Sequence, residues 1–197
     1  MAKGAKKLLA VALAGAGLYG AWTIGKSLLS DDDGASESTR HVVNQVWIER
    51  MPTSGRDMIG HLVVVDHPQG HFGAAGKSSQ WRHIIEGFVW KLEGHRLNVY
   101  FPQDEVHAAV AVKTYECEGE APSPFELCLE ISNGRRSMTY YSRRDWKIEP
   151  QDVADSLADI VEETPELGVL TDHLVETTAD IDALDVESFE TVDRLPL

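Results

Sequence analysis

The sequence contains few cysteines and has fewer basic than acidic residues. Two cysteines in 197 residues are too few for a disulfide-rich scaffold. Lysine and arginine total 18 against 32 acidic residues, and the formal net charge is −14. Nucleic-acid binding needs a basic surface that displaces counterions. The charge balance therefore argues against nucleic acid as a partner.

The sequence motifs of common enzymes are also missing. There is no G-x-S-x-G, no H-E-x-x-H, no C-x-x-C, no phosphate-binding glycine loop and no EF-hand spacing. Four histidines recur at intervals of twelve residues: His71, His83, His95 and His107. If each begins a successive strand of a meander, alternate histidines fall at opposite ends, and two imidazoles alone make a poor metal site. We expect no enzymatic activity, no metal and no cofactor.

An apolar stretch near the N-terminus has the length of a membrane anchor. Eighteen uncharged residues, from Leu8 to Gly25, would form a helix of about 27 Å, close to the bilayer core of about 30 Å. Three lysines precede the stretch and three aspartates follow it, which favours a cytoplasmic N-terminus. We expect a single-pass inner-membrane protein with its C-terminal domain in the periplasm. The alternative is a signal peptide cleaved after Ala14-Gly15-Ala16.

Charge and composition divide the chain into four segments. Residues 150–197 carry fourteen acidic groups and one basic group, whereas residues 41–149 carry fourteen and twelve. We predict an N-terminal anchor or signal peptide over 1–30, a polar tether over 31–43, a β-barrel over 44–149, and an acidic, helical or partly disordered tail over 150–197.

The segment from 44 to 149 alternates apolar and polar residues with a period of two and has no helical period. Strands are expected near residues 46–51, 58–65, 71–76, 83–92, 97–101, 106–115, 125–131 and 137–142, with 77–80 as a connection. Without crossover helices, neighbouring strands should pair antiparallel. We predict a mainly β fold, an eight-stranded antiparallel up-and-down barrel with an N-terminal apolar helix and a C-terminal acidic helical tail.

The strand block resembles the calycin superfamily, the lipocalin-like barrels. The resemblance rests on the strand count, the meander order, and Trp47 in the first strand with Arg143 or Arg144 after the last. In lipocalins a Trp and an Arg so placed pack together and close the base of the barrel. The glycine expected two residues before the Trp is replaced by Gln45. The resemblance implies a barrel that binds a small hydrophobic ligand.

The apolar faces of the central strands supply the candidate ligand-facing residues. These are Ile84, Glu86, Phe88, Trp90, Leu97, Val99, Phe101, Val110 and Val112. Side chains could equally fill the interior. Glu86 is the one acid among them, and a carboxylate inside a barrel needs a partner. Arg50, on the same side of the first strand as Val46 and Ile48, is a candidate partner; a shift in strand register and a ligand-anchoring role are the alternatives.

Cys117 and Cys128 fall on the polar face of consecutive strands. Such residues can be cross-strand neighbours and could form a disulfide in an oxidising compartment, or they could be two unrelated thiols.

The tail begins with an amphipathic pattern. Val153, Leu157, Ile160 and Val161 recur at helical spacing, which predicts a helix from Gln151 to Glu163 packed on the barrel. The remaining acidic segment could contact a protein partner. We expect a membrane-anchored, non-enzymatic barrel that binds a small hydrophobic ligand or a protein partner in the cell envelope. The alternative is a scaffolding subunit of an envelope complex with a solid barrel.

Overall fold

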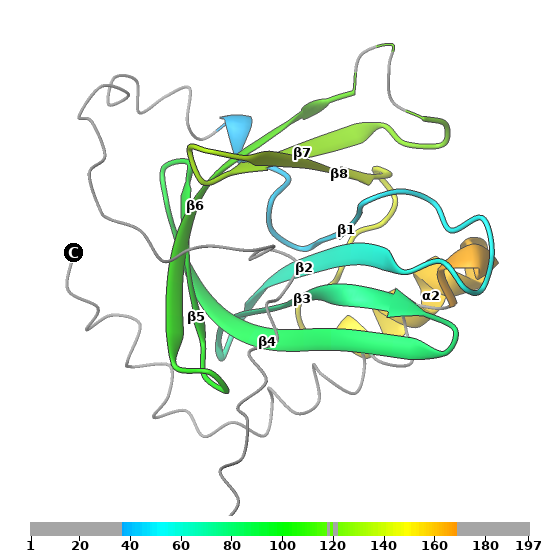
Figure 1. The fold of residues 1–197 in the computed structure, drawn as a ribbon, viewed down its shortest axis with the longest axis horizontal. Helices are drawn as coiled ribbons and strands as arrows, with labels where there is room; N and C mark the ends of the chain where they lie inside the picture. The colour runs from blue at the N-terminus through cyan, green and yellow to red at the C-terminus, as the bar shows by residue number, and fades with distance from the viewer. Residues whose placement is uncertain (1–36, 118, 120–121, 169–197) are drawn as a thin grey trace, which may run out of the picture.

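The computed structural model describes residues 37–117, 119 and 122–168. Eight antiparallel strands form a closed barrel in which each strand pairs with the next and the last pairs with the first. The strands are β1 (Gln45–Ile48), β2 (Ile59–His67), β3 (Gly70–Ser79), β4 (Arg82–Glu93), β5 (Arg96–Phe101), β6 (Val106–Glu116), β7 (Leu127–Ser132) and β8 (Ser137–Ser142). Figure 1 shows them as a ring. The predicted mainly β, eight-stranded antiparallel barrel is confirmed.

Three parts of the sequence prediction lie outside the described residues. They are the N-terminal anchor over 1–30, the first part of the tether, and the tail from residue 169 onward. Within the described residues, no helix combines the length and hydropathy needed to cross a bilayer.

The barrel interior is an apolar cluster built by strand alternation. On β4, for example, Phe88 and Trp90 belong to the interior cluster while Val89 between them points outward. The buried members of the interior cluster are Val42, Trp47, Leu62, Val64, Ala75, Phe88, Trp90, Leu97, Val99, Phe101, Val110, Val112, Leu127, Leu129, Ile131 and Tyr140. Side chains therefore occupy much of the space that the strands enclose.

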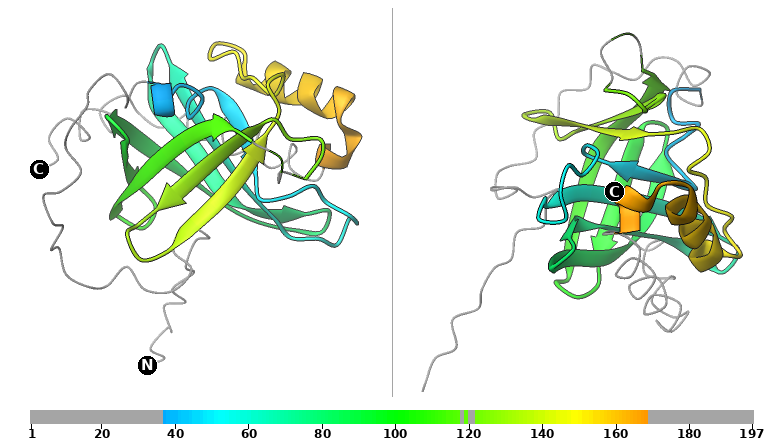
Figure 2. Two further views of the ribbon diagram at one scale, coloured as in Figure 1. Left: turned by 90° about the horizontal axis from the view of Figure 1, so that it is seen from above. Right: turned by 90° about the vertical axis from the view of Figure 1, so that its right-hand side faces the viewer.

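A second apolar cluster lies outside the barrel, beneath a helix. Helix α2 (Val153–Glu163) buries Leu157 and Ile160, and the short 3₁₀ helix η2 (Pro165–Leu167) follows it. These residues pack with the outward side chains of β1, β2 and β3, as the helix beside the ring in Figures 1 and 2 illustrates. The predicted packing of a first tail helix on the barrel matches this arrangement.

This outer cluster corrects the assignment of faces on the first strand. Val46 and Ile48 were expected to face the barrel interior together with Arg50, but both belong to the outer cluster. Trp47 faces inward instead. Alternation could not distinguish the two faces because α2 covers the outer one, so every residue of β1 is buried.

The third strand is longer than its sequence indicated. Residues 77–80 were expected to connect two strands, but β3 continues through Ser79 and pairs with β4 as far as Arg82. Small residues in β3 weaken the alternation signal yet serve the packing. A Cβ added at Gly73 would lie 2.4 Å from Phe88 Cζ and 2.5 Å from the Val63 carbonyl oxygen. Glycine there lets the Phe88 ring lie against the sheet.

The meander gives the barrel two distinct ends. We call the end with the β1–β2, β3–β4, β5–β6 and β7–β8 connections the mouth, and the opposite end the base. Residues 37–43 were expected to belong to a tether, but Val42 is fully buried in the interior cluster. The chain therefore packs against the base before it enters β1.

Candidate functional site

The base of the barrel is closed by the chain segment that precedes β1. The indole Nε1 of Trp47 donates a hydrogen bond to the Val42 carbonyl at 3.3 Å. The Thr114 hydroxyl donates to the Ser38 carbonyl at 3.1 Å, and the His41 amide donates to the Thr114 hydroxyl at 3.4 Å. Trp47, predicted to take part in barrel closure, therefore lies at the closed end. The group that accepts its indole hydrogen bond is a backbone carbonyl, that of Val42.

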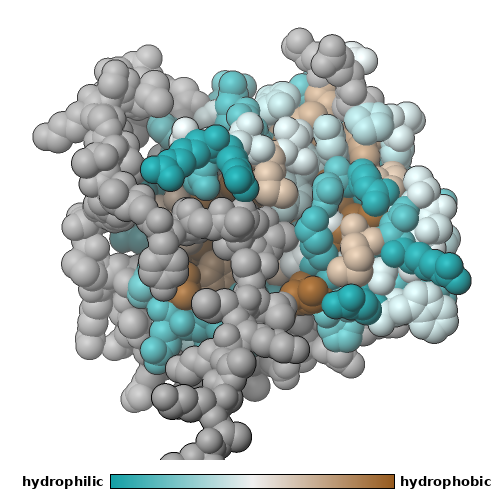
Figure 3. Space-filling view, viewed as in Figure 1, coloured by the Kyte–Doolittle hydropathy of each residue, from teal (hydrophilic) through white to brown (hydrophobic). Residues whose placement is uncertain are grey.

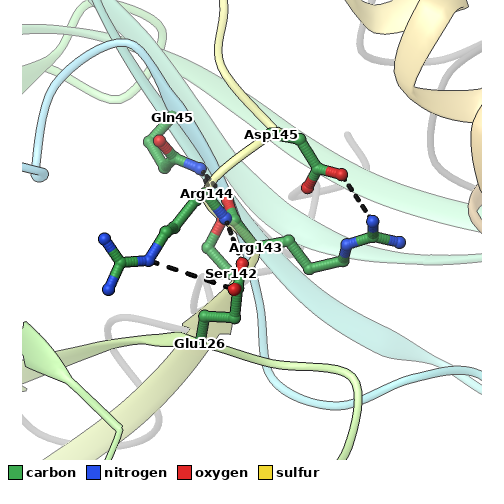
Figure 4. A network of polar contacts seen from close by, with 6 residues as sticks. All are labelled: Gln45, Glu126, Ser142, Arg143, Arg144 and Asp145. Carbon is green, nitrogen blue, oxygen red and sulfur yellow. Dashed lines mark hydrogen bonds and ion pairs between the residues drawn. The ribbon is translucent and has the colours of Figure 1, made fainter.

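Buried side chains join β8 to β1 beside the base. The Gln45 side-chain amide donates to the Ser142 hydroxyl at 2.7 Å and to the Arg143 carbonyl at 2.6 Å. The Ser142 hydroxyl in turn donates to the Val46 carbonyl at 2.6 Å. Figure 4 shows this network together with the two arginines.

Both arginines that the lipocalin resemblance assigned to barrel closure form ion pairs with carboxylates. The Arg143 guanidinium pairs with Asp145, and that of Arg144 lies 2.6 Å from Glu116 and 3.9 Å from Glu126. Each of these side chains is about one-third to more than one-half exposed. These contacts belong to the surface around the β8–β1 seam, and packing of an Arg on Trp47 is not among them.

Most of the predicted ligand-facing residues lie on the inner wall of the barrel. Seven of the nine are buried members of the interior cluster: Phe88, Trp90, Leu97, Val99, Phe101, Val110 and Val112. The rings of Phe88 and Phe101 form an edge-on pair with centroids 5.6 Å apart. The Trp90 indole donates to the carbonyls of Val65 and Phe72, which fixes it across the β2–β3 hairpin near the base. The deep part of the barrel is therefore filled.

The mouth differs from the deep interior because several of its inward side chains are only partly buried. Ala108 of β6 and Met138 of β8 pack against the interior cluster and remain partly exposed. Ile84 of β4 is also half-buried, nearer the β3–β4 turn. Figure 3, which shares the view of Figure 1, shows brown apolar atoms beside teal hydrophilic ones on the described part of this face. The mouth therefore presents apolar atoms beside polar ones.

A charged pair lies across the inner wall at the mouth. The Lys77 ammonium is 3.3 Å from the Glu49 carboxylate, which also accepts a hydrogen bond from the Gly60 amide at 3.2 Å. Glycine at position 60 makes this possible, because an added Cβ would lie 2.7 Å from the carboxylate oxygen.

Burial, reinforced by the charge of Glu49, raises the pKa of Tyr140 to about 12. The Tyr140 hydroxyl therefore stays neutral under physiological conditions.

Glu86 lies on the same inner wall. It pairs across the sheet with Ala75 and is half-buried. Burial, together with the nearby charge of Asp104, raises the pKa of the Glu86 carboxyl. Within the residues that the structure describes, this carboxyl forms no hydrogen bond or ion pair.

The expected partner of Glu86 is used elsewhere. Arg50 follows β1 and pairs with Asp57 at 3.3 Å. Asp57 also accepts hydrogen bonds from the backbone amide and the hydroxyl of Thr53, which orders the β1–β2 loop. The expected Arg50–Glu86 ion pair is therefore wrong. The register alternative fails as well, because Glu86 lies in an uninterrupted β3–β4 ladder.

The cysteines lie at the base, and the evenly spaced histidines are divided between the two ends, with His83 and His107 at the start of β4 and β6 at the mouth. Cys117 and Cys128 form a disulfide, with Cα atoms 5.3 Å apart, at the base end of β6 and β7. Two of the evenly spaced histidines have other contacts: His71 lies 2.8 Å from Asp66, and His107 stacks on Tyr100. Across the described ranges, no group of three or more potential ligands is placed to hold a metal ion.

Sequence reasoning missed Glu49, Lys77 and Tyr140. Lys77 was assigned to a connection because the small residues of β3 carry little alternation, and Glu49 was placed on the outer face by the inverted assignment of β1. The β3–β4 hairpin could have revealed the position of Lys77. If Gln80 and Trp81 form a two-residue turn, Lys77 lies opposite Ile84 and therefore on the same face of the sheet as Glu86.

Comparisons with protein-family models, with curated protein sequences and with solved structures each found no match to this chain. The class of the protein therefore rests on its own fold. It is an eight-stranded antiparallel β-barrel with a closed base, a polar and partly apolar mouth, and one helix packed on its outer wall. Such a barrel is compatible with a lipocalin-like fold.

Proposed function

We propose that this protein is a non-enzymatic, calycin-like barrel that binds a small, mostly apolar ligand at its mouth. The observation that carries the proposal is the contrast between the two ends of the interior. The deep wall is filled by Phe88 and Trp90, whereas Ala108 and Met138 at the mouth are inward-facing and still partly exposed. Ligand sites are usually apolar recesses with a few polar groups, and Glu49, Lys77 and Glu86 would supply those groups.

The proposed location is the periplasmic side of a bacterial inner membrane, with an N-terminal helix as the anchor. The charge pattern of residues 1–33 supports the orientation. The Cys117–Cys128 disulfide supports an oxidising compartment, because disulfides are rare in proteins kept in a reducing cytosol. The proposal also includes a protein partner that binds the acidic tail, residues 150–197.

A scaffolding role is the second candidate, and the filled interior favours it. Phe88 is 1% exposed and Trp90 is 5% exposed, so the deep barrel offers rigidity in place of a cavity. On this alternative, the tail and the outer surface would make the contacts, and the mouth would bind nothing.

Native mass spectrometry of the purified full-length chain separates the two candidates. We expect a co-purifying mass in the range of a small lipid. Ala108→Leu should reduce the ligand-bound fraction several-fold, because the larger side chain would fill the mouth. Ala109→Leu is the matched control, since Ala109 lies on the outer face of the same strand.

Two results would contradict ligand binding at the mouth. One is a ligand-free chain that is recovered only in a stable hetero-complex, which would support scaffolding. The other is an equal loss of bound ligand in the Ala108 and Ala109 variants.

A further inference from the structure

Glu86 is a carboxylate in an apolar wall, and no charged or hydrogen-bonding partner for it lies among residues 37–117, 119 and 122–168. Its neighbours along the inner face of β4 are Ile84 and Phe88, and its cross-strand neighbour is Ala75. None of these side chains can donate a hydrogen bond. A buried or half-buried carboxylate is costly unless donors or a cation satisfy it. Among the described residues, the Glu86 carboxylate therefore lacks the donor or cation that would stabilise its charge.

Two cations that could have completed the site are committed elsewhere. Lys77 is the closest candidate by register, because it lies opposite Ile84 on the inner wall. Its ammonium lies 3.3 Å from Glu49, on the side of the wall away from β4. Arg50 is held by Asp57 in the β1–β2 loop. Neither Lys77 nor Arg50 therefore neutralises the Glu86 carboxylate.

The charges next to Glu86 favour a cation over an anion. Asp104 of the β5–β6 connection adds its negative charge to that of Glu86, and no cation among the described residues offsets the raised pKa of the Glu86 carboxyl. Glu49 and Lys77 form a neutral pair, and three arginines of the mouth, Arg82, Arg135 and Arg136, lie at its outer rim, at or just beyond the ends of strands. Beside Glu86 on the same face of β4, the half-buried Ile84 side chain offers apolar surface, whereas Phe88 and Phe101 are almost fully buried. A ligand with an ammonium group on a short apolar body would match both features, since charge-assisted hydrogen bonds are the stronger ones.

We propose that the mouth of the barrel binds amphipathic amines, with Glu86 as the partner of the ammonium group and the partly exposed side chains of Ile84, Ala108 and Met138 as the apolar contacts. This inference rests on the proposed function and specifies the chemical class of its ligand.

Three probes with one apolar body and different head groups test the inference. They are 4-phenylbutylamine, 4-phenylbutanol and 4-phenylbutanoate, titrated calorimetrically into the full-length chain at pH 7, with a detergent blank. The amine should bind at least about tenfold more tightly than the alcohol, as expected for one charge-assisted pair. The carboxylate should bind more weakly than the alcohol.

The variants assign the preference to one residue. Glu86→Gln should weaken amine binding about tenfold and leave alcohol binding unchanged, because it removes the charge and keeps the shape. Glu93→Gln is the matched control: it removes one negative charge from the same strand at the base end, where Glu93 pairs with Lys91. It should leave all three affinities unchanged.

The possible failures are distinguishable. If the alcohol binds and the amine has no advantage, or if Glu86→Gln and Glu93→Gln have the same effect, the amine inference is wrong while the apolar site stands. Tightest binding of the carboxylate would indicate that an anion displaces Glu49 from Lys77, and would also overturn the inference. If none of the probes binds above the blank, both the inference and the proposed ligand binding are contradicted.

Discussion

Two physical effects act on the Glu86 carboxyl in the same direction. Its place between Ile84 and Phe88 on the inner wall removes part of its hydration, and Asp104 adds a like charge nearby. Both effects favour the protonated carboxyl. A residue that destabilises the folded chain at neutral pH is typical of a site where function is gained at the expense of stability.

The first prediction concerns the pH dependence of this cost. Because the pKa of Glu86 is raised above its ordinary value near 4.5 in the folded chain, its contribution is favourable below about that pH and is lost as the pH rises through the raised pKa. Glu86→Gln, which mimics the protonated form, should therefore gain stability relative to the wild type at pH 7 and little or none at pH 4. Urea unfolding at the two pH values measures the difference.

Glu93→Gln serves as the control for the loss of one negative charge in this acidic protein. If the stability advantage of Glu86→Gln is the same at both pH values, or is larger at pH 4, the proposed desolvation of Glu86 is wrong.

At the scale of elements, the barrel closes through an unusually short pairing. β1 and β8 share one register pair, Ile48 with Tyr141, whereas β2 and β3 share nine. Close to this seam, the Gln45 side chain and the Ser142 hydroxyl form hydrogen bonds that a longer strand ladder would provide through the backbone. Side-chain chemistry thus supports closure where the sheet itself is weakest.

Ser142→Ala should therefore destabilise the barrel by about 1–3 kcal/mol, because it leaves the buried Gln45 amide without one acceptor and the Val46 carbonyl without a donor. Chemical denaturation followed by tryptophan fluorescence provides the measurement. Ser137→Ala, at an exposed position of the same strand, should change stability by less than about 0.5 kcal/mol. Equal effects of the two substitutions would show that the seam does not depend on the Ser142 hydroxyl.

At the scale of the whole molecule, the barrel wall separates two apolar clusters. The inner one is built by alternating strand residues, and the outer one joins β1–β3 to α2. The two ends of the barrel also differ, since the chain enters at the base and the candidate site lies at the mouth. An anchor in residues 1–30 would therefore attach to the barrel through its closed end.

The orientation of the chain in a bacterial cell can be tested with fusions after Leu197. A reporter that folds only in the periplasm should be active, and one that works only in the cytoplasm should be inactive. The same fusions lacking residues 1–30 should reverse both results. Activity of the cytoplasmic reporter alone in the full-length fusion would overturn the proposed location, and reduced thiols at Cys117 and Cys128 in the same cells would agree with that outcome.

The sequence by itself determined the barrel and most of its inner wall. Period-two alternation on β4, β5 and β6 is a local property, so Phe88, Val99 and Val110 could be assigned to one face without knowing what they contact. The absence of a helical period between strands likewise implied antiparallel neighbours. The amphipathic spacing of Leu157 and Ile160 predicted a helix that needs an apolar surface.

Tertiary structure decided the orientation of β1 and the partners of the charged residues. Both faces of β1 are buried, so alternation alone could not tell Trp47 from Val46. The pairing of Lys77 with Glu49 joins residues 28 positions apart in the chain, and the pairing of β1, β2 and β3 brings them together. Among the described residues Glu86 has no charged partner, which alternation could not show, because ion pairs depend on distances in space that strand periodicity does not encode.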